Sequence, residues 1–185
     1  VMATVSGKKY KVIGTSPIRH DGADKVTGRA IYGIDYHTTG MLWGKILRSP
    51  FPHAKILSID TTKARELPGV LAVITGQDLP DRRVGRRLRD FPVLARDRVL
   101  FVGEKVAAVA AETADIAEEA LLLIDVKYEE LPAVFDAFEA MKPEAPVLHP
   151  DMASYVGLPE PASTISENNV FAHNSWSKGD LEQGF

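Results

Sequence analysis

The chain has 185 residues, which suffices for one good-sized domain or for one domain with an extended segment. Its hydrophobic fraction of 45% and charged fraction of 25% are those of an ordinary folded protein and exclude disorder of the whole chain. The net charge of -3 excludes a global positive field for nucleic acid or an anionic membrane, and the absence of cysteine excludes disulfides, thiolate zinc sites and iron–sulfur ligation by this chain.

The N-terminal third predicts an arm followed by strands. Residues 1–28 are polar and rich in glycine, which favours extended chain and turns. Strand-like runs then follow at 29–36, 41–48 and 54–60. The first two are joined by a short link with a glycine, so they predict a hairpin. A short helix at 61–69, ended by Pro68 and Gly69, leads to an apolar strand at 70–75.

A long connection at 76–98 comes next and carries five arginines, Arg82, Arg83, Arg86, Arg87 and Arg89. Connections of this length inside compact domains are usually functional or mobile. Guanidinium groups could bind a carboxylate, a phosphate or a coenzyme A ester through paired hydrogen bonds. The alternative is a solvated, positively charged loop that serves solubility or a subunit contact. The candidate substrate-channel or anion-contact residues are Arg86, Arg87, Leu88, Arg89 and Phe91.

The next segments predict a sheet with a covering helix. Strands are expected at 99–103 and 105–111, with a bulge or tight bend at Gly103 between them. In the predicted helix 113–124, apolar residues recur on one face while Glu118 and Glu119 face outward, so this helix should cover one face of the sheet. The apolar residues of that face are Ile116, Ala117, Ala120, Leu121 and Ile124.

The C-terminal part predicts a last strand and then irregular chain. A strand at 125–131 is stopped by Pro132, and 136–141 is a short helix. Prolines punctuate residues 142–168, which predict an extended linker. Residues 169–185 begin a strand and then a helix, as expected at the start of a following, truncated domain of a longer polypeptide.

Ser49, His53 and Asp60 raise the question of a catalytic triad. A nucleophilic serine needs a base within hydrogen-bonding reach and an oxyanion hole. Pro50 removes a backbone N–H from the place where that hole would use one, so a structural turn is favoured. In that interpretation Arg48 and His53 tie the turn to its neighbours, and Asp60 lies where a strand passes into a helix.

Metal and nucleotide sites are not indicated. The histidines have no i, i+4 pair and no cysteine partners, which argues against zinc. Gly28 and Gly33 match neither a phosphate loop nor a dinucleotide fingerprint.

Five segments in a constant order resemble the large, molybdopterin-binding subunit of the xanthine dehydrogenase and aldehyde oxidase (molybdenum hydroxylase) family. They are "DKVTGRAIYGID" (24–35), "GMLWGKILRSPFPHAKILSID" (40–60), "LPGVLAVITGQDLP" (67–80), "PVLARDRVLFVGEKVAAVAAET" (92–113) and "DVKYEELPAV" (125–134). Lys105 departs from the family pattern, which usually continues Gly-Glu/Gln with proline. The resemblance implies an α+β fold, the α/β hammerhead, with a mixed sheet and a covering helix over residues 29–141.

The resemblance also implies an enzyme whose chemistry lies outside these residues. The family oxidatively hydroxylates aldehydes or N-heteroaromatic carbons with oxygen derived from water. Its molybdopterin-type molybdenum cofactor would be bound downstream, with iron–sulfur clusters and FAD on partner domains or subunits of an oligomeric assembly. The cofactor loops and the base glutamate of the family do not occur here, so no catalytic, cofactor-binding or metal residue is assigned. We expect a cytoplasmic location, with the periplasm as the alternative, and neither nucleic acid nor a membrane span.

Two hypotheses follow. The first is that the chain is an N-terminal piece of a molybdenum hydroxylase large subunit, in which it is structural and borders the substrate channel. The rival is a binding or assembly module that retains the hammerhead fold without catalysis, because a fold alone does not confer function.

Overall fold

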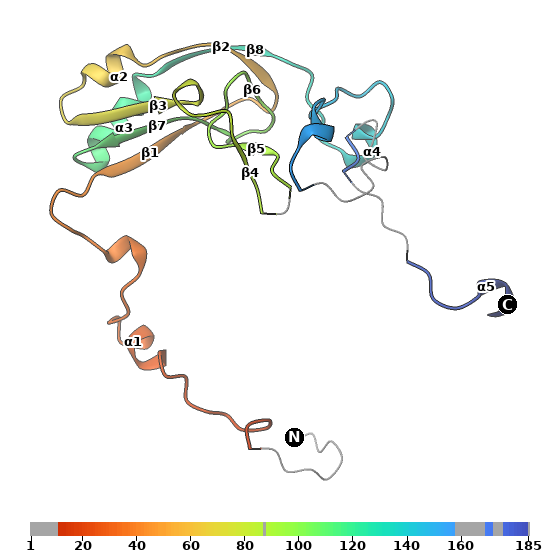
Figure 1. The fold of residues 1–185 in the computed structure, drawn as a ribbon. Helices are drawn as coiled ribbons and strands as arrows, with labels where there is room; N and C mark the ends of the chain where they lie inside the picture. Colours follow the sequence, from red (N-terminus) through yellow and green to blue (C-terminus); the bar gives the residue numbers. More distant parts are fainter. Residues whose placement is uncertain (1–10, 87, 158–168, 172–175, 185) are drawn as a thin grey trace. The chain divides into compact units, whose positions relative to one another are not determined.

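The computed structural model describes residues 11–86, 88–157, 169–171 and 176–184. The chain divides into two units, residues 1–41 and 42–185 (Figure 1). The described part of the first unit contains a short helix, α1 (Gly22–Val26), and a 3₁₀ turn, η1 (Gly33–Asp35), neither of which buries a residue.

The strand predicted at 29–36, and its hairpin with 41–48, are wrong. The Tyr32 N–H donates to the Asp35 carboxylate at 3.0 Å and closes η1, while Ile31 and Ile34 are exposed. The strand that begins at Trp43 pairs with residues 105–111 and not with 29–36. Residues 29–36 pair with no strand of the described chain, and an unpaired strand is not stable in water.

The strands of the second unit form two three-stranded sheets and one two-stranded ribbon (Figure 1). Their bounds are β1 (Trp43–Arg48), β2 (Ala54–Asp60), β3 (Val70–Thr75), β4 (Arg83–Val84), β5 (Phe91–Pro92), β6 (Arg98–Val99), β7 (Lys105–Ala111) and β8 (Asp125–Glu130). The strand orders are β1-β7-β3, β6-β2-β8 and β4-β5. Each of these pairings is antiparallel. The strands predicted at 41–48, 54–60, 70–75, 105–111 and 125–131 are confirmed.

The helices of this unit begin at side chains that accept hydrogen bonds from their first turns. They are α2 (Thr62–Glu66), α3 (Ala114–Leu122), α4 (Ala137–Ala140) and α5 (Leu181–Gly184), with 3₁₀ turns η2 (Gly76–Asp78) and η3 (Met152–Ser154). Thr113 accepts from the Ile116 N–H at the start of α3, and Asp136 accepts from two N–H groups of α4. The predicted helices at 61–69, 113–124 and 136–141 are confirmed, and α5 confirms the predicted helix start. The strand expected before α5 lies partly outside the described residues.

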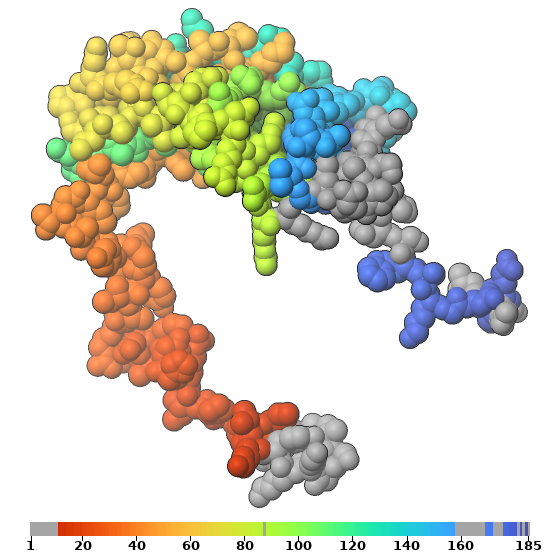
Figure 2. Space-filling view, in the orientation of Figure 1, coloured from red at the N-terminus to blue at the C-terminus, as the bar shows by residue number. Residues whose placement is uncertain are grey.

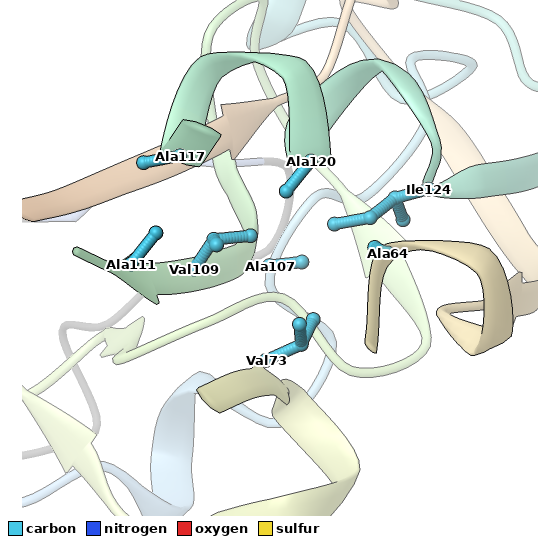
Figure 3. Packing of buried hydrophobic residues seen from close by; sticks show 8 residues of the cluster. All are labelled: Ala64, Val73, Ala107, Val109, Ala111, Ala117, Ala120 and Ile124. Atoms are coloured by element: carbon cyan, nitrogen blue, oxygen red, sulfur yellow. The ribbon is translucent and has the colours of Figure 1, made fainter. Parts of the chain in front are cut away.

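The main core lies between α3 and one face of the β1-β7-β3 sheet (Figure 3). Side chains alternate along β7, so Ala107, Val109 and Ala111 face the helix. They meet Ala117 and Ala120, whose small size allows the helix to approach the sheet closely. The prediction that this helix covers the sheet is confirmed. Each fully buried valine of this core contributes about 1.5–3 kcal/mol relative to an exposed one.

The opposite face of β7 supplies Val106 to a second, smaller core. Ala54, Ala95 and Val99 complete this cluster. The rings of Phe51 and Tyr128 pack at its edge with their centroids 5.1 Å apart. The second core therefore joins the β6-β2-β8 sheet to one end of β7.

The strand predicted at 99–103 is mostly a turn. Regular pairing ends at Val99, and Gly103 bends the chain with a φ of 90°. The Gly103 N–H donates to the Ser49 carbonyl oxygen and the Ser49 N–H donates to that of Glu104, each at 2.8 Å. These bonds attach the segment to the β1–β2 turn, so its backbone is not available for a ladder. The predicted bend at Gly103 is confirmed, although Lys105 stands where the family usually has proline.

Candidate functional site

The turn between β1 and β2 is structural. The Phe51 N–H donates to the Ser49 Oγ at 3.0 Å, which closes the turn through the side chain. The Asp60 carboxylate accepts from both the N–H and the hydroxyl of Thr62 at the start of α2. These bonds lower the pKa of Asp60 below its ordinary value. Ser49 and Asp60 are therefore engaged elsewhere, and the structure does not assemble a triad.

His53 and Arg48 hold this turn against neighbouring segments, as predicted. The buried His53 ring contacts the Pro132 carbonyl oxygen through Nδ1 at 2.6 Å, which favours the tautomer with hydrogen on Nδ1. The Arg48 guanidinium donates to the Gly103 carbonyl oxygen at 2.8 Å. His53 therefore links the β1–β2 turn to the end of β8, where Pro132 stops the strand.

The arginine-rich connection forms a small hairpin from β4 and β5. Arg86 and Arg89 are exposed, Leu88 is half-buried and Phe91 is 48% exposed; Arg87 lies outside the described residues. Gly85 is required here because a Cβ at that position would overlap the Leu88 carbonyl oxygen. The described members of the predicted group thus share one hairpin, with Arg86 and Arg89 open to solvent.

Arg83 has a different role from its neighbours in the arginine group. Its guanidinium lies 4.5 Å from the centroid of the Tyr155 ring and donates to the Asp90 carbonyl oxygen at 2.8 Å. Tyr155 is only 7% exposed, and its hydroxyl lies 3.2 Å from His149 Nδ1. The Arg89 N–H donates to the Val156 carbonyl oxygen at 2.9 Å. A cation–π contact and a backbone hydrogen bond therefore dock residues 149–156 on the hairpin.

Figure 2 shows this docked segment, in blue, against the yellow-green residues of the hairpin. Sequence reasoning placed Tyr155 and His149 in a linker and did not assign either to a site. The available signal was a tyrosine close to a histidine within a polar, proline-rich stretch.

A polar pocket of about 130 Å³ lies between the hairpin, residues 96–104 and the docked segment. Its titratable lining consists of Arg83, Arg96, Arg98, Asp97, Glu104, Asp151 and His149. Arg96 already donates to the carbonyl oxygens of Gly76 and Leu79, at 2.9 and 2.8 Å. The lining therefore combines three guanidinium groups with three carboxyl groups.

Burial sets the protonation of the pocket's titratable groups. It raises the pKa of Glu104, whose carboxylate accepts from the Leu100 N–H. It lowers the pKa of His149, with nearby Asp90 opposing that shift, and it raises the pKa of Tyr155. Near neutral pH the His149 imidazole and the Tyr155 phenol are therefore neutral, as expected of groups that pack a junction.

Metal binding and membrane crossing find no support in the parts of the chain that the structure describes. No three His, Cys, Asp or Glu side chains there are grouped so that they could hold a metal ion. No helix in the same ranges is long and apolar enough to cross a bilayer.

Comparison with known proteins gives consistent matches. A family model described as "Aldehyde oxidase and xanthine dehydrogenase, a/b hammerhead domain" matches residues 27–132. The chain is 44% identical over 171 residues to a probable xanthine dehydrogenase subunit of Bacillus subtilis (strain 168), covering 92% of this chain and 21% of that protein. It is 39% identical over 146 residues to the nicotinate dehydrogenase large molybdopterin subunit of Eubacterium barkeri, covering 78% of this chain and 34% of that protein.

A solved structure agrees with these sequence matches. The crystal structure of quinoline 2-oxidoreductase from Pseudomonas putida 86 superposes with a TM-score of 0.66 at 44% identity, covering 74% of this chain and 19% of that chain. The chain thus spans about a fifth to a third of the length of these curated relatives.

Proposed function

The chain belongs to the aldehyde oxidase and xanthine dehydrogenase α/β hammerhead family, and from that premise we propose that it is the hammerhead portion of a molybdenum hydroxylase large subunit. The family resemblance and the fold predicted from the sequence are both confirmed. The observation that carries the proposal is the match over residues 27–132, together with 44% identity to the Bacillus subtilis xanthine dehydrogenase subunit over 92% of the chain.

The proposed whole protein oxidatively hydroxylates an aldehyde or an N-heteroaromatic carbon with oxygen from water. The proposal assigns the molybdenum cofactor to the remainder of the large subunit, and iron–sulfur clusters and FAD to partner domains or subunits. We place this oligomeric assembly in the cytoplasm. No catalytic step is assigned to residues of this chain.

Within that assembly we propose two roles for this chain. The sheets and α3 form a scaffold that packs against the cofactor-binding domains. The connection that forms the β4–β5 hairpin, with the candidate residues Arg86, Arg87, Leu88, Arg89 and Phe91, borders the path of substrate to the active site. The exposure of Arg86 and Arg89 supports the second role, because both guanidinium groups can reach a carboxylate from solvent.

The enzyme proposal is tested on the native assembly. The chain is tagged in its own host, the complex is purified, and its molybdenum content is measured by mass spectrometry. Aldehydes and N-heteroaromatic compounds are then supplied in H₂¹⁸O. We expect molybdenum in the complex and ¹⁸O in the hydroxylated product. A stable complex without molybdenum would overturn the proposal in favour of a non-catalytic assembly module.

The hairpin proposal is tested with the double variant Arg86→Ala/Arg89→Ala in the whole enzyme. We expect a higher KM for carboxylate-bearing substrates and an unchanged KM for neutral ones. The reason is that each lost charge-assisted hydrogen bond weakens the binding of anionic substrates only. Lys63→Ala, which removes an exposed cation from α2, is the matched control. Equal saturation behaviour of both variants with an anionic substrate would refute this role.

A further inference from the structure

The β1-β7-β3 sheet has one covered face and one open face. The Lys45 ammonium lies 3.1 Å from the Glu118 carboxylate on α3, so Lys45 points toward the helix. Its neighbours Gly44 and Ile46 therefore lie on the opposite face, because side chains alternate along a strand. The strand register continues that face across the sheet in two rows. The first row is Gly44, Ala110 and Ala72, and the second is Ile46, Ala108 and Ile74.

These six residues form the open face, and all of them are apolar and incompletely buried. Ile46 and Ile74 are each 39% exposed. Ala108 and Ala110 are only half-buried although β7 is the central strand. On the covered face of the same strand, Ala107 and Ala111 are fully buried. A Cβ built on Gly44 meets no atom within 4 Å. No layer of the described residues of the second unit therefore covers this end of the sheet.

An open face of this composition is unusual for a sheet that meets water. Antiparallel sheets with one solvated face normally carry polar side chains there, whereas both rows here lack a polar or charged side chain. The second core buries this side of β7 only at Val106. On the remaining surface the central strand β7 contributes only Ala108 and Ala110, and side chains this small let another element approach closely.

We propose that the open face is the docking surface for an apolar segment of the remainder of the large subunit. This inference rests on the proposed function. The occupant follows from chain length: this chain covers 21% and 34% of its curated relatives and 19% of the superposed quinoline 2-oxidoreductase chain. In those proteins most of the polypeptide lies outside the hammerhead portion and is covalently present at high local concentration. A permanent partner of this kind suits an interface core without charged groups.

The first experiment is hydroxyl-radical footprinting of the native assembly. Ile46 and Ile74 report on the open face, and Leu57 on β2, which is 60% exposed, is the matched control. Because a docked apolar interface excludes water, labelling of Ile46 and Ile74 should be at least about tenfold below that of Leu57. Labelling in proportion to the exposed fractions of 39% and 60% would refute docking.

The second experiment identifies the occupant. A photo-cross-linking amino acid replaces Ile46 in the full-length subunit, and the cross-linked peptide is sequenced by mass spectrometry. A peptide from the remainder of the same subunit supports the proposal. A peptide from a second copy of this sheet or from another subunit, or no cross-link, overturns it. The molybdenum content of the same sample reports separately on the proposed function, so a molybdenum-loaded enzyme whose residue 46 cross-links elsewhere refutes the docking surface alone.

The variant Ala108→Arg gives an independent readout. Its side chain would extend from the open face, so the sheet itself should tolerate it, but docking would bury an unpaired charge. We expect recovery of the assembled complex to fall at least about tenfold. The control Leu122→Arg lies on α3 at a side chain that is 84% exposed and should leave recovery unchanged. Equal recovery of the two variants would contradict the proposal.

Discussion

Replacement of Tyr155 by alanine should release residues 149–156 from the β4–β5 hairpin. The change removes a nearly buried ring, which contributes about 1.5–3 kcal/mol through burial of apolar surface. It also removes the cation–π contact with Arg83 at 4.5 Å, a contact that contributes about 0.5–2 kcal/mol. Because the two contributions overlap in the same ring, we expect a total loss of about 2–4 kcal/mol of docking free energy.

The Arg89 amide reports directly on this docking, since its N–H donates to the Val156 carbonyl oxygen. In the range where exchange follows the opening equilibrium, a loss of about 2–4 kcal/mol accelerates hydrogen exchange roughly 30- to 700-fold. Amide exchange of Arg89 is measured by nuclear magnetic resonance or by mass spectrometry of short peptides. The Val109 amide in the main core serves as the internal reference and should not change.

Tyr155→Phe is the matched control because it keeps the ring and its contact with Arg83. It loses only the hydroxyl contact with His149 at 3.2 Å, which is a loss of about 1 kcal/mol or less and roughly a fivefold change in exchange. Unchanged Arg89 exchange in Tyr155→Ala would refute the docking of residues 149–156. Equal acceleration in both variants would show that the hydroxyl, and not the ring, holds the segment.

Three further predictions concern buried groups and close approaches. Burial raises the pKa of Glu104 above its ordinary value of 4.5, so the folded state binds this proton more tightly than the unfolded chain does. Its favourable contribution is complete below the unfolded pKa and is lost as pH rises through the folded pKa. Glu104→Gln, which retains an acceptor for the Leu100 N–H, should match the parent protein in acid and be more stable than it at neutral pH; parallel urea-unfolding profiles would contradict this. Gly76→Ala should destabilise by about 1–3 kcal/mol because its Cβ would overlap the Ala95 carbonyl oxygen, whereas Gly44→Ala, which enters open space, should not lower the thermal unfolding midpoint. His53→Ala leaves the Pro132 carbonyl oxygen without its donor and should cost about 1–3 kcal/mol of stability with turnover per molybdenum unchanged; a folded, fully loaded and inactive variant would disprove a structural role.

Local signals predicted most elements of the second unit. The apolar period of residues 113–124 placed α3 and its buried face correctly, because that face needs only a sheet to pack against. The runs at β3 and β7 were predicted as strands because they are continuous, apolar and of strand length. Pro132 marked the end of β8 for a similar reason, since proline has no N–H for a ladder.

The sequence was less informative where a contact with a distant segment decides the structure. Residues 29–36 have the composition of a strand, but β1 pairs with β7, 57 or more positions later, and no strand of the described chain pairs with 29–36. Arg83 was grouped with Arg86 and Arg89 by sequence, and only its contact with Tyr155, 72 positions later, separates a packed guanidinium from exposed ones. The sequence of an arginine-rich segment does not show which of its arginines will form a cation–π contact with an aromatic ring.

The sequence by itself determined the family, the identities of most strands and helices, and the structural interpretation of Ser49, His53 and Asp60. Tertiary structure alone decided the strand order β1-β7-β3, the docking of residues 149–156 on the hairpin, and the exposure of the open face. The physical reason is the sequence distance over which each interaction acts. Helix periods, caps and turn residues involve neighbours a few positions apart. Strand pairing and the covering of a sheet face depend on contacts between segments that are far apart in the sequence.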